Sequence, residues 1–218
     1  MIGFWEKLWG FLFPPKCILC RAILEKNETD LCGACRKTAP EHLKTNIKLS
    51  SVARWRAVWY YKDDVRKSIL RYKFGNARHY ADAYGRMLAM KLLEEQPEVL
   101  TWVPIGKKRL RRRGFDQCRL LAEAVGRELG MEPVQTLVKC KDTPPQSTIR
   151  RAQERRANVL GVYRMADGAD VAGKRVLLLD DVITTGATVS ECAGVLRRAG
   201  AKEVVCAAVA AASHDMKK

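Results

Sequence analysis

The sequence predicts an α/β protein in which helices flank a parallel sheet and a small cysteine-rich module precedes the sheet. The apolar run at 176–179 is typical of a buried parallel strand, and a glycine-containing turn and a helical pattern follow it. Two Cys-x-x-Cys pairs near the N-terminus indicate the separate module. A chain of 218 residues is long enough for one well-buried α/β domain and a small appendage.

The chain begins with an amphipathic helical pattern. Apolar residues recur at helical spacing from Phe4 to Leu12, and Pro14-Pro15 ends the segment. Such a helix can dock on the body of the protein, on a partner or peripherally on a membrane. We favour the body, because two nearby lysines make a weak basic face. Without a signal-peptide pattern or a run of ~18–20 apolar residues, we expect a cytoplasmic protein with no transmembrane segment.

Four of the eight cysteines form two knuckles, Cys17-x-x-Cys20 and Cys32-x-x-Cys35. Each knuckle offers two thiolates to one cation, and the eleven intervening residues let the chain complete a tetrahedron. In an intracellular chain, this pattern favours metal over disulfides. The sequence therefore predicts a structural zinc site that supplies folding energy to a segment with little core. The isolated cysteines are interpreted as core or incidental: Cys118, Cys140, Cys192 and Cys206.

The remaining chain alternates strand and helix patterns after a linker at 38–50. We expect, in order, a strand at 52–61, helices at 65–75 and 80–95, a strand at 100–105, a helix at 118–130, and strands at 134–140 and 203–210. Gly130 marks the end of one helix, and Gly85 lies within another, where it permits close packing.

Two carboxylates and a turn of small residues follow the strand at 176–179. Asp180 and Asp181 come first, and 184–188 read TTGAT before the next helical pattern. A glycine-containing turn at a helix N-terminus attracts anions, because backbone N–H groups and the helix dipole converge there. Adjacent carboxylates repel a bare phosphate but suit sugar hydroxyls, or a divalent cation that the ligand carries. The pattern therefore predicts a site for a phosphorylated ribose. An ordinary acidic loop explains the strand but not the paired acids.

This run resembles the ribose-5-phosphate loop of type I phosphoribosyltransferases, which bind phosphoribosyl pyrophosphate (PRPP) with magnesium. The resemblance implies a type I phosphoribosyltransferase-like parallel sheet. It also implies that Asp180 and Asp181 are the catalytic pair, which holds the ribose hydroxyls. The turn that would cradle the 5′-phosphate consists of Thr184, Thr185, Gly186, Ala187 and Thr188.

The formal net charge of +16 suggests a polyanionic partner, nucleic acid first and an anionic membrane second. A simpler explanation of the positive charge is that it keeps the protein soluble and attracts a pyrophosphorylated substrate. Six of the seven positions at 107–113 are basic, directly after a predicted strand, where α/β sheets bind ligands. We expect PRPP to be contacted there by Gly106, Lys107, Lys108 and Arg109. The candidate nucleic-acid residues are Arg111, Arg112, Arg113, Arg150, Arg151 and Arg155.

Further motifs narrow the resemblance to the ComF family, a phosphoribosyltransferase-like group associated with DNA uptake in natural transformation. They are VPI before the basic run, RGFDQ with LLA, TPPQS, and R-x-x-N with Tyr163, together with the cysteine knuckles. Asp116 departs from the expected asparagine, and its carboxylate either weakens anion binding or points away. The resemblance implies a zinc-ribbon-like module with the amphipathic helix at 1–48, a phosphoribosyltransferase-like domain at 49–213 and a tail at 214–218.

Three functions from different classes follow from this resemblance. The first is a ComF-like protein that binds PRPP–magnesium and single-stranded DNA and works with a competence helicase or other uptake proteins. The second is a metabolic phosphoribosyltransferase with an unidentified acceptor. The third is a PRPP-sensing scaffold without catalysis. The basic run and the zinc module favour the first, because simple salvage enzymes need neither. Transfer would depend on positioning and electrostatic stabilisation, so the sequence identifies no acceptor.

Overall fold

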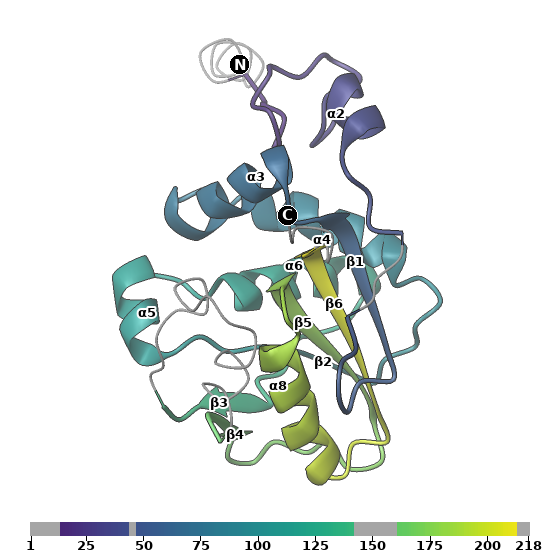
Figure 1. The fold of residues 1–218 in the computed structure, drawn as a ribbon, viewed down its shortest axis with the longest axis vertical. Coiled ribbons are helices and arrows are strands. Elements are labelled where there is room, and N and C mark those ends of the chain that lie inside the picture. The colour runs from purple at the N-terminus through teal and green to yellow at the C-terminus, as the bar shows by residue number, and fades with distance from the viewer. Residues whose placement is uncertain (1–13, 44–46, 142–160, 213–218) are drawn as a thin grey trace, which may run out of the picture.

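The computed structural model describes residues 14–43, 47–141 and 161–212. Its centre is a four-stranded sheet with the strand order β1-β6-β5-β2 (Figure 1). Every pair of neighbouring strands in it is parallel, so the predicted fold class is confirmed. The strands are β1 (Arg54–Tyr60), β2 (Val99–Trp102), β5 (Arg175–Ile183) and β6 (Glu203–Ala211).

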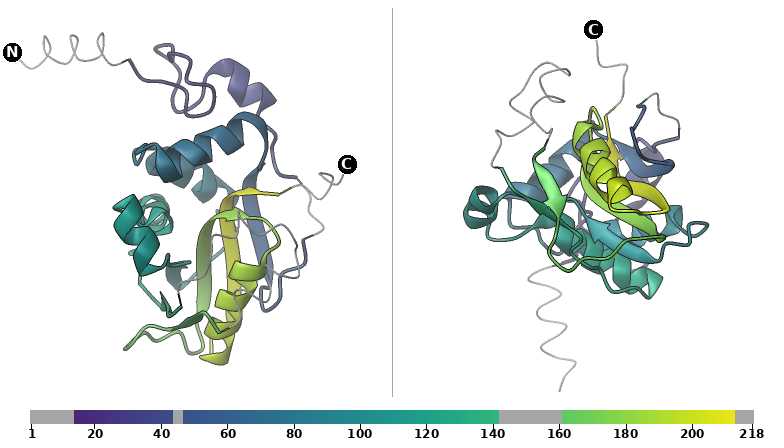
Figure 2. Two further views of the ribbon diagram at one scale, coloured as in Figure 1. Left: turned by 60° about the vertical axis from the view of Figure 1, so that its left-hand side comes forward. Right: turned by 90° about the horizontal axis from the view of Figure 1, so that it is seen from below.

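Helices cover both faces of this sheet. On one face α4 (Tyr80–Lys91) packs against α6 (Gln117–Leu129), and α8 (Ala187–Arg198) covers the other face (Figures 1 and 2). The buried side chains accordingly form two hydrophobic clusters, and the adjacent Leu178 and Leu179 of β5 belong to different ones. A strand that is buried on both faces must be apolar at successive positions, which explains the unbroken run at 176–179.

β5 extends beyond the apolar run. It continues to pair with β6, for example Asp180 with Ala208, after its pairing with β2 has ended at Trp102 and Leu179. Asp180 and Asp181 therefore lie inside the strand and not after it. The two acids therefore lie at the carboxyl end of the sheet. Because β2 ends before them, they have a neighbouring strand on the β6 side only.

Helix α3 (Asp63–Phe74) lies across this carboxyl end, between the sheet and the N-terminal module, which contains α2 (Gly33–Thr38) (Figure 1). Ile18 and Leu19 of the module belong to the same buried cluster as residues of α3, α4 and α6. The module therefore shares the main hydrophobic core, and the boundary near residue 48 stays a prediction.

The other elements differ in part from the sequence-based expectations. The basic run forms a helix, α5 (Lys107–Arg113). The strand expected at 134–140 is shorter, β3 (Leu137–Lys139), and pairs antiparallel with β4 (Tyr163–Met165) in a separate two-stranded sheet. Gly130 ends α6 in the left-handed conformation, as predicted.

Some predictions fall outside the described residues. They concern the helical pattern from Phe4 to Leu12, the TPPQS motif and the candidate nucleic-acid residues Arg150, Arg151 and Arg155. Within the described ranges, no helix has both the length and the apolar character needed to cross a membrane.

Close packing of α4 against α6 depends on Gly85. A Cβ atom there would lie 2.6 Å from the Ala124 Cβ and 2.9 Å from the Ala124 carbonyl carbon. We expect Gly85→Ala to lower the free energy of unfolding by about 1–3 kcal/mol in urea denaturation, because the helices must separate. Gly194→Ala in α8 is the control, since its closest neighbour is the flexible end of Arg198 at 3.2 Å. An equal loss in both variants would contradict this account.

Candidate phosphoribosyl site and zinc module

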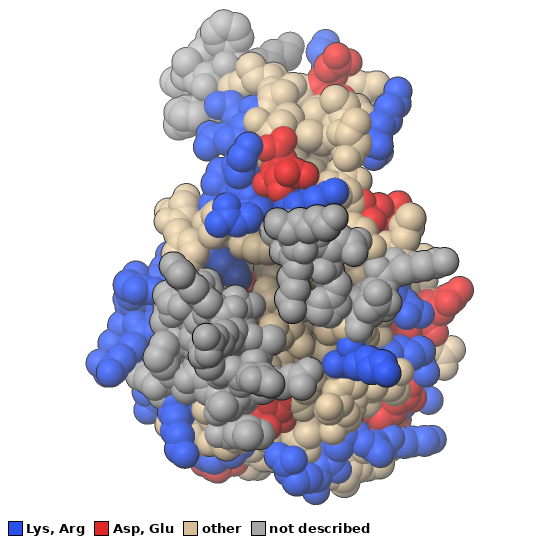
Figure 3. Space-filling model, in the orientation of Figure 1, with Lys and Arg blue, Asp and Glu red and all other residues tan. Residues whose placement is uncertain are grey.

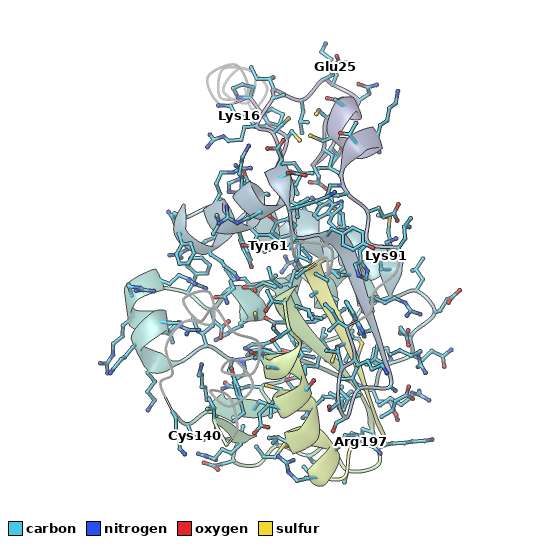
Figure 4. All side chains as sticks on the ribbon, in the orientation of Figure 1. Lys16, Glu25, Tyr61, Lys91, Cys140 and Arg197 are labelled. Atoms are coloured by element: carbon cyan, nitrogen blue, oxygen red, sulfur yellow. The ribbon has the colours of Figure 1, made fainter. Side chains whose placement is uncertain are left out.

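A cavity of about 410 Å³ opens at the carboxyl end of β5. Its walls come from α3, α5, the start of α6, the β3–β4 pair and the end of β5. Tyr61 also lines it and lies between α3 and the sheet (Figure 4). Residues that are distant in the sequence, from Tyr61 to Thr188, therefore line the same cavity.

The two predicted acids converge on this cavity. Asp181 Oδ1 lies 2.8 Å from Lys73 Nζ of α3, and Asp181 Oδ2 is buried without a hydrogen-bond partner in the described part of the chain. Asp180 Oδ1 accepts hydrogen bonds from the Asp181 backbone N–H at 2.8 Å and from the Cys118 thiol at 3.4 Å. One oxygen of each acid and Cys118 Sγ lie within 4.8 Å of one another.

Burial and the neighbouring Asp181 charge raise the pKa of Asp180 to about 7. Burial alone would lower the pKa of Lys73, but the Asp181 carboxylate more than offsets this, so the pKa rises and Lys73 is charged. Because an ammonium group already balances Asp181, the cluster suits hydroxyl donors better than a bare divalent cation.

The predicted phosphate turn connects β5 to α8. Gly186 is the N-cap of α8 with a φ of 76°, a left-handed conformation that strains other residues. A Cβ atom there would also overlap the Leu49 side chain. Both the conformation and the packing therefore require glycine at this position.

Only two residues of the predicted phosphate turn line the cavity. Thr184 and Thr188 line it, whereas Thr185, Gly186 and Ala187 are not among its lining residues. Thr185 Oγ1 accepts a hydrogen bond from the Ala187 N–H at 3.5 Å. Since Thr188 belongs to the first turn of α8, the N-terminus of this helix opens toward the cavity.

Only some residues of the basic run at 107–113 line the cavity. Its lining residues are Arg109, Arg112 and Arg113; Lys107, Lys108 and Arg111 are exposed elsewhere on α5, and Gly106 is the buried N-cap of this helix. Lys and Arg side chains gather over α5 on the molecular surface (Figure 3). The Arg113 guanidinium lies 4.9 Å from the ring centroid of Phe74, an aromatic side chain that is 63% exposed.

Asp116 points away from the cavity. Its Oδ1 accepts hydrogen bonds from the N–H groups of Cys118 at 3.0 Å and Arg119 at 3.2 Å, and its Oδ2 accepts one from Ile105 at 3.2 Å. Asp116 is thus the N-cap of α6. Of the two alternatives for this departure from asparagine, the structure shows the second.

Sequence reasoning missed two residues of the site. The isolated position of Cys118 in the sequence predicts a core or incidental residue; Cys118 is buried, but its thiol also contacts Asp180. Lys73 was not singled out, although it lies one turn after Ile69 and next to Tyr72, both fully buried. A lysine on the buried side of a helix needs a charged partner, so the position of Lys73 in the helical pattern could have identified it as a candidate site residue.

The four paired cysteines also come together, as predicted, with their sulfur atoms within 4.8 Å of one another. Cys20 Sγ and Cys32 Sγ are 3.6 Å apart, and no disulfide joins them. Backbone N–H groups of Ala22 and Cys35 donate to these two sulfurs at 3.4 and 3.5 Å. Four clustered sulfurs, of which Cys20 Sγ and Cys32 Sγ accept backbone hydrogen bonds, fit a closed structural zinc site.

The zinc module is anchored on α3 and α4. The Arg71 guanidinium and the Ser68 hydroxyl donate to the Ile18 carbonyl, inside the first knuckle, at 2.8 and 2.5 Å. Arg86 forms two hydrogen bonds with Asp30, at 2.9 and 2.6 Å. The module thus contacts the helix that also carries Lys73.

Two family models match the chain. A phosphoribosyl transferase domain matches residues 116–218, and a double zinc ribbon domain matches residues 8–46. Together they cover more than half of the chain. Among solved structures, the allosteric regulatory enzyme of purine biosynthesis aligns with a TM-score of 0.44 and 24% identity, over 63% of this chain and 29% of that one, which is too low to support an inference.

Three curated relatives match over most of the chain. DNA utilization protein YhgH of Escherichia coli O157:H7 is 28% identical over 88% of this chain and 94% of that protein. Competence protein F of Haemophilus influenzae is 27% identical over 87% and 93%, and competence protein ComFC of Bacillus subtilis is 28% identical over 90% and 84%. In its zinc ribbon, its phosphoribosyl transferase domain and its similarity to these relatives, the chain resembles the ComF family of phosphoribosyltransferase-like proteins.

Proposed function

We propose that this protein binds PRPP with magnesium in the cavity at the end of β5, binds single-stranded DNA on the adjacent basic rim, and assists DNA uptake in natural transformation. The main support is that one cavity of about 410 Å³ is lined by both acids, by two threonines of the turn and by three arginines of α5: Asp180, Asp181, Thr184, Thr188, Arg109, Arg112 and Arg113. The competence names of two relatives support the role in uptake. We further propose a cytoplasmic location and a competence helicase or another uptake protein as partner.

In this proposal, the ribose hydroxyls donate hydrogen bonds to Asp180 and Asp181. The buried Asp181 Oδ2 is suited to this, since no described group occupies it. Thr184, Thr188 and the N-terminus of α8 bind the 5′-phosphate through hydroxyl groups, backbone N–H groups and the helix dipole.

The pyrophosphate is proposed to lie toward α5. Arg109 lines the cavity there, with Gly106, Lys107 and Lys108 in the first turn of that helix and before it. Magnesium bound with PRPP supplies neutralisation of the pyrophosphate charge. The protein's own part is to position the sugar and to stabilise charge inside a sheltered cavity.

Single-stranded DNA is proposed to bind along the same rim. Arg111 and Arg112 are exposed on α5, and Arg113 stacks on the exposed Phe74. Cationic side chains that neutralise phosphates, next to an aromatic ring on which a base can stack, are typical of single-strand binding without sequence preference.

Calorimetric titration tests the PRPP site. We expect the wild-type protein to bind PRPP–magnesium, and Asp181→Asn to weaken binding by about tenfold or more, because a neutral amide accepts a weaker hydrogen bond from a ribose hydroxyl. The control is Asp167→Asn, which removes a carboxylate that is 91% exposed and outside the cavity. Absence of PRPP binding by the wild-type protein would refute the proposal.

Fluorescence anisotropy with a labelled oligonucleotide tests the DNA surface. Affinity should fall steeply with salt, and Arg112→Gln should reduce the slope of log K against log salt by about 0.7, as expected for one lost phosphate contact on a single strand. Lys202→Gln, an exposed charge before β6 at the opposite end of the sheet, should leave the slope unchanged. Binding that does not depend on salt contradicts this proposal.

Native mass spectrometry and urea denaturation test the zinc module. We expect one zinc ion per chain, and we expect Cys20→Ser to abolish zinc binding and lower the unfolding midpoint, because the metal supplies folding free energy. Cys140→Ser replaces an exposed cysteine near β3, far from the module (Figure 4), and should change neither measurement. Full stability of the metal-free protein would contradict a structural role for zinc.

A further inference from the structure

We propose that Lys73 of α3 is a positioning residue of the sugar site: it holds one oxygen of Asp181 so that the other oxygen is presented to the ligand. This inference rests on the proposed PRPP site and adds to it a residue from a helix outside the motif at 176–188.

The ion pair is sheltered and asymmetric. Lys73 Nζ lies 2.8 Å from Asp181 Oδ1, and the two side chains are only 19% and 6% exposed. Asp181 Oδ2 is buried without a hydrogen-bond partner among the described residues. Lys73 and Asp181 both line the cavity, one from α3 and the other from β5.

An aspartate carboxylate rotates easily about its last side-chain torsion, whose preference is broad. A charge-assisted hydrogen bond to one oxygen fixes the plane of the group and thereby the direction of the second oxygen. Since Lys73 engages Oδ1, Oδ2 is the atom left for a ribose hydroxyl. A prearranged acceptor also spares the ligand the cost of ordering it.

Neighbouring residues of α3 hold Lys73 in place. The Arg71 guanidinium and the Ser68 hydroxyl bind the Ile18 carbonyl of the zinc module, and the Tyr72 hydroxyl donates to the Gln117 carbonyl at 2.6 Å. One stretch of helix is thus tied to the module on one side and to α6 on the other. Lys73 extends from this stretch into the acidic site.

Two other roles for Lys73 give different predictions. A lysine that contacts the pyrophosphate would affect PRPP but not ribose 5-phosphate, and a lysine that competes with the ligand for Asp181 would weaken binding. The charged and titratable groups of the surrounding elements that interact electrostatically with Asp181 are Lys73 and Tyr72 of α3, Tyr84 of α4, Arg113 of α5, Asp116 and Cys118 at α6, and Asp180 of β5.

The test compares three variants of the full chain by calorimetry with PRPP–magnesium and with ribose 5-phosphate. We expect Lys73→Met to weaken both ligands by a similar factor of about ten or more, as for loss of a hydrogen bond that fixes a charged group. Lys73→Arg keeps the charge and should restore most of the affinity. Lys67→Met, on the same helix, removes a lysine that is 67% exposed and pairs with Asp64, and should bind like the wild type.

The pH profile separates positioning from a merely structural role. Binding requires the ionised acids, so wild-type affinity should fall as the pH decreases through about 7, the pKa of Asp180. The Lys73 charge lowers that pKa, so Lys73→Met should move the midpoint to higher pH. General loosening of the fold would lower affinity without moving the midpoint.

Unchanged affinity in Lys73→Met, tighter binding, or a loss confined to PRPP would each overturn the inference. If Lys73→Met does not fold, as judged by circular dichroism, Lys73→Gln replaces it. Its neutral amide can donate only a weaker hydrogen bond to Asp181, so a smaller loss of affinity for both ligands and the same shift of the midpoint to higher pH are expected. Failure of the wild-type protein to bind either ligand would instead overturn the proposed function.

Discussion

Two adjacent carboxylates at the end of a strand are costly to bury unless a cation balances them, and this requirement organises the site. β2 ends before β5, so Asp180 and Asp181 have no strand beside them on the β2 side, and Lys73 of α3 provides the compensating charge. α3 must therefore lie across the end of the sheet. In doing so, it also forms one wall of the cavity and gives the zinc module a surface on which to pack.

The zinc module therefore acts as a support for the main domain. Ile18 and Leu19 lie in the same hydrophobic cluster as the helices on one face of the sheet, and the first knuckle binds Ser68 and Arg71 through a backbone carbonyl. A metal that orders the knuckle also orders these contacts. α3 lies between the module and the end of the sheet that carries the acidic pair, although these parts are far apart in the sequence (Figure 1).

Features with a local cause could be predicted from the sequence. The apolar run, the acids and the turn before α8 depend on neighbouring residues, and the two knuckles depend on short spacing. What depends on tertiary packing was missed: the Lys73–Asp181 pair, the Cys118–Asp180 contact and the separate β3–β4 sheet. Asp116 shows the same limit, because only the fold shows that its carboxylate caps α6.

The segment at 47–50, which follows the zinc module, packs against the predicted phosphate turn and the start of α8. Leu49 fills the space that a side chain at position 186 would need, and the Ser50 N–H donates to Ser190 Oγ of α8 at 3.0 Å. These contacts lie at the predicted start of the phosphoribosyltransferase-like domain, which Leu49 and Ser50 tie to the turn and to α8. A shortened or chimeric protein that keeps the sheet but discards residues 47–50 would lose the side-chain contacts that support the predicted phosphate turn, whether or not the metal is bound.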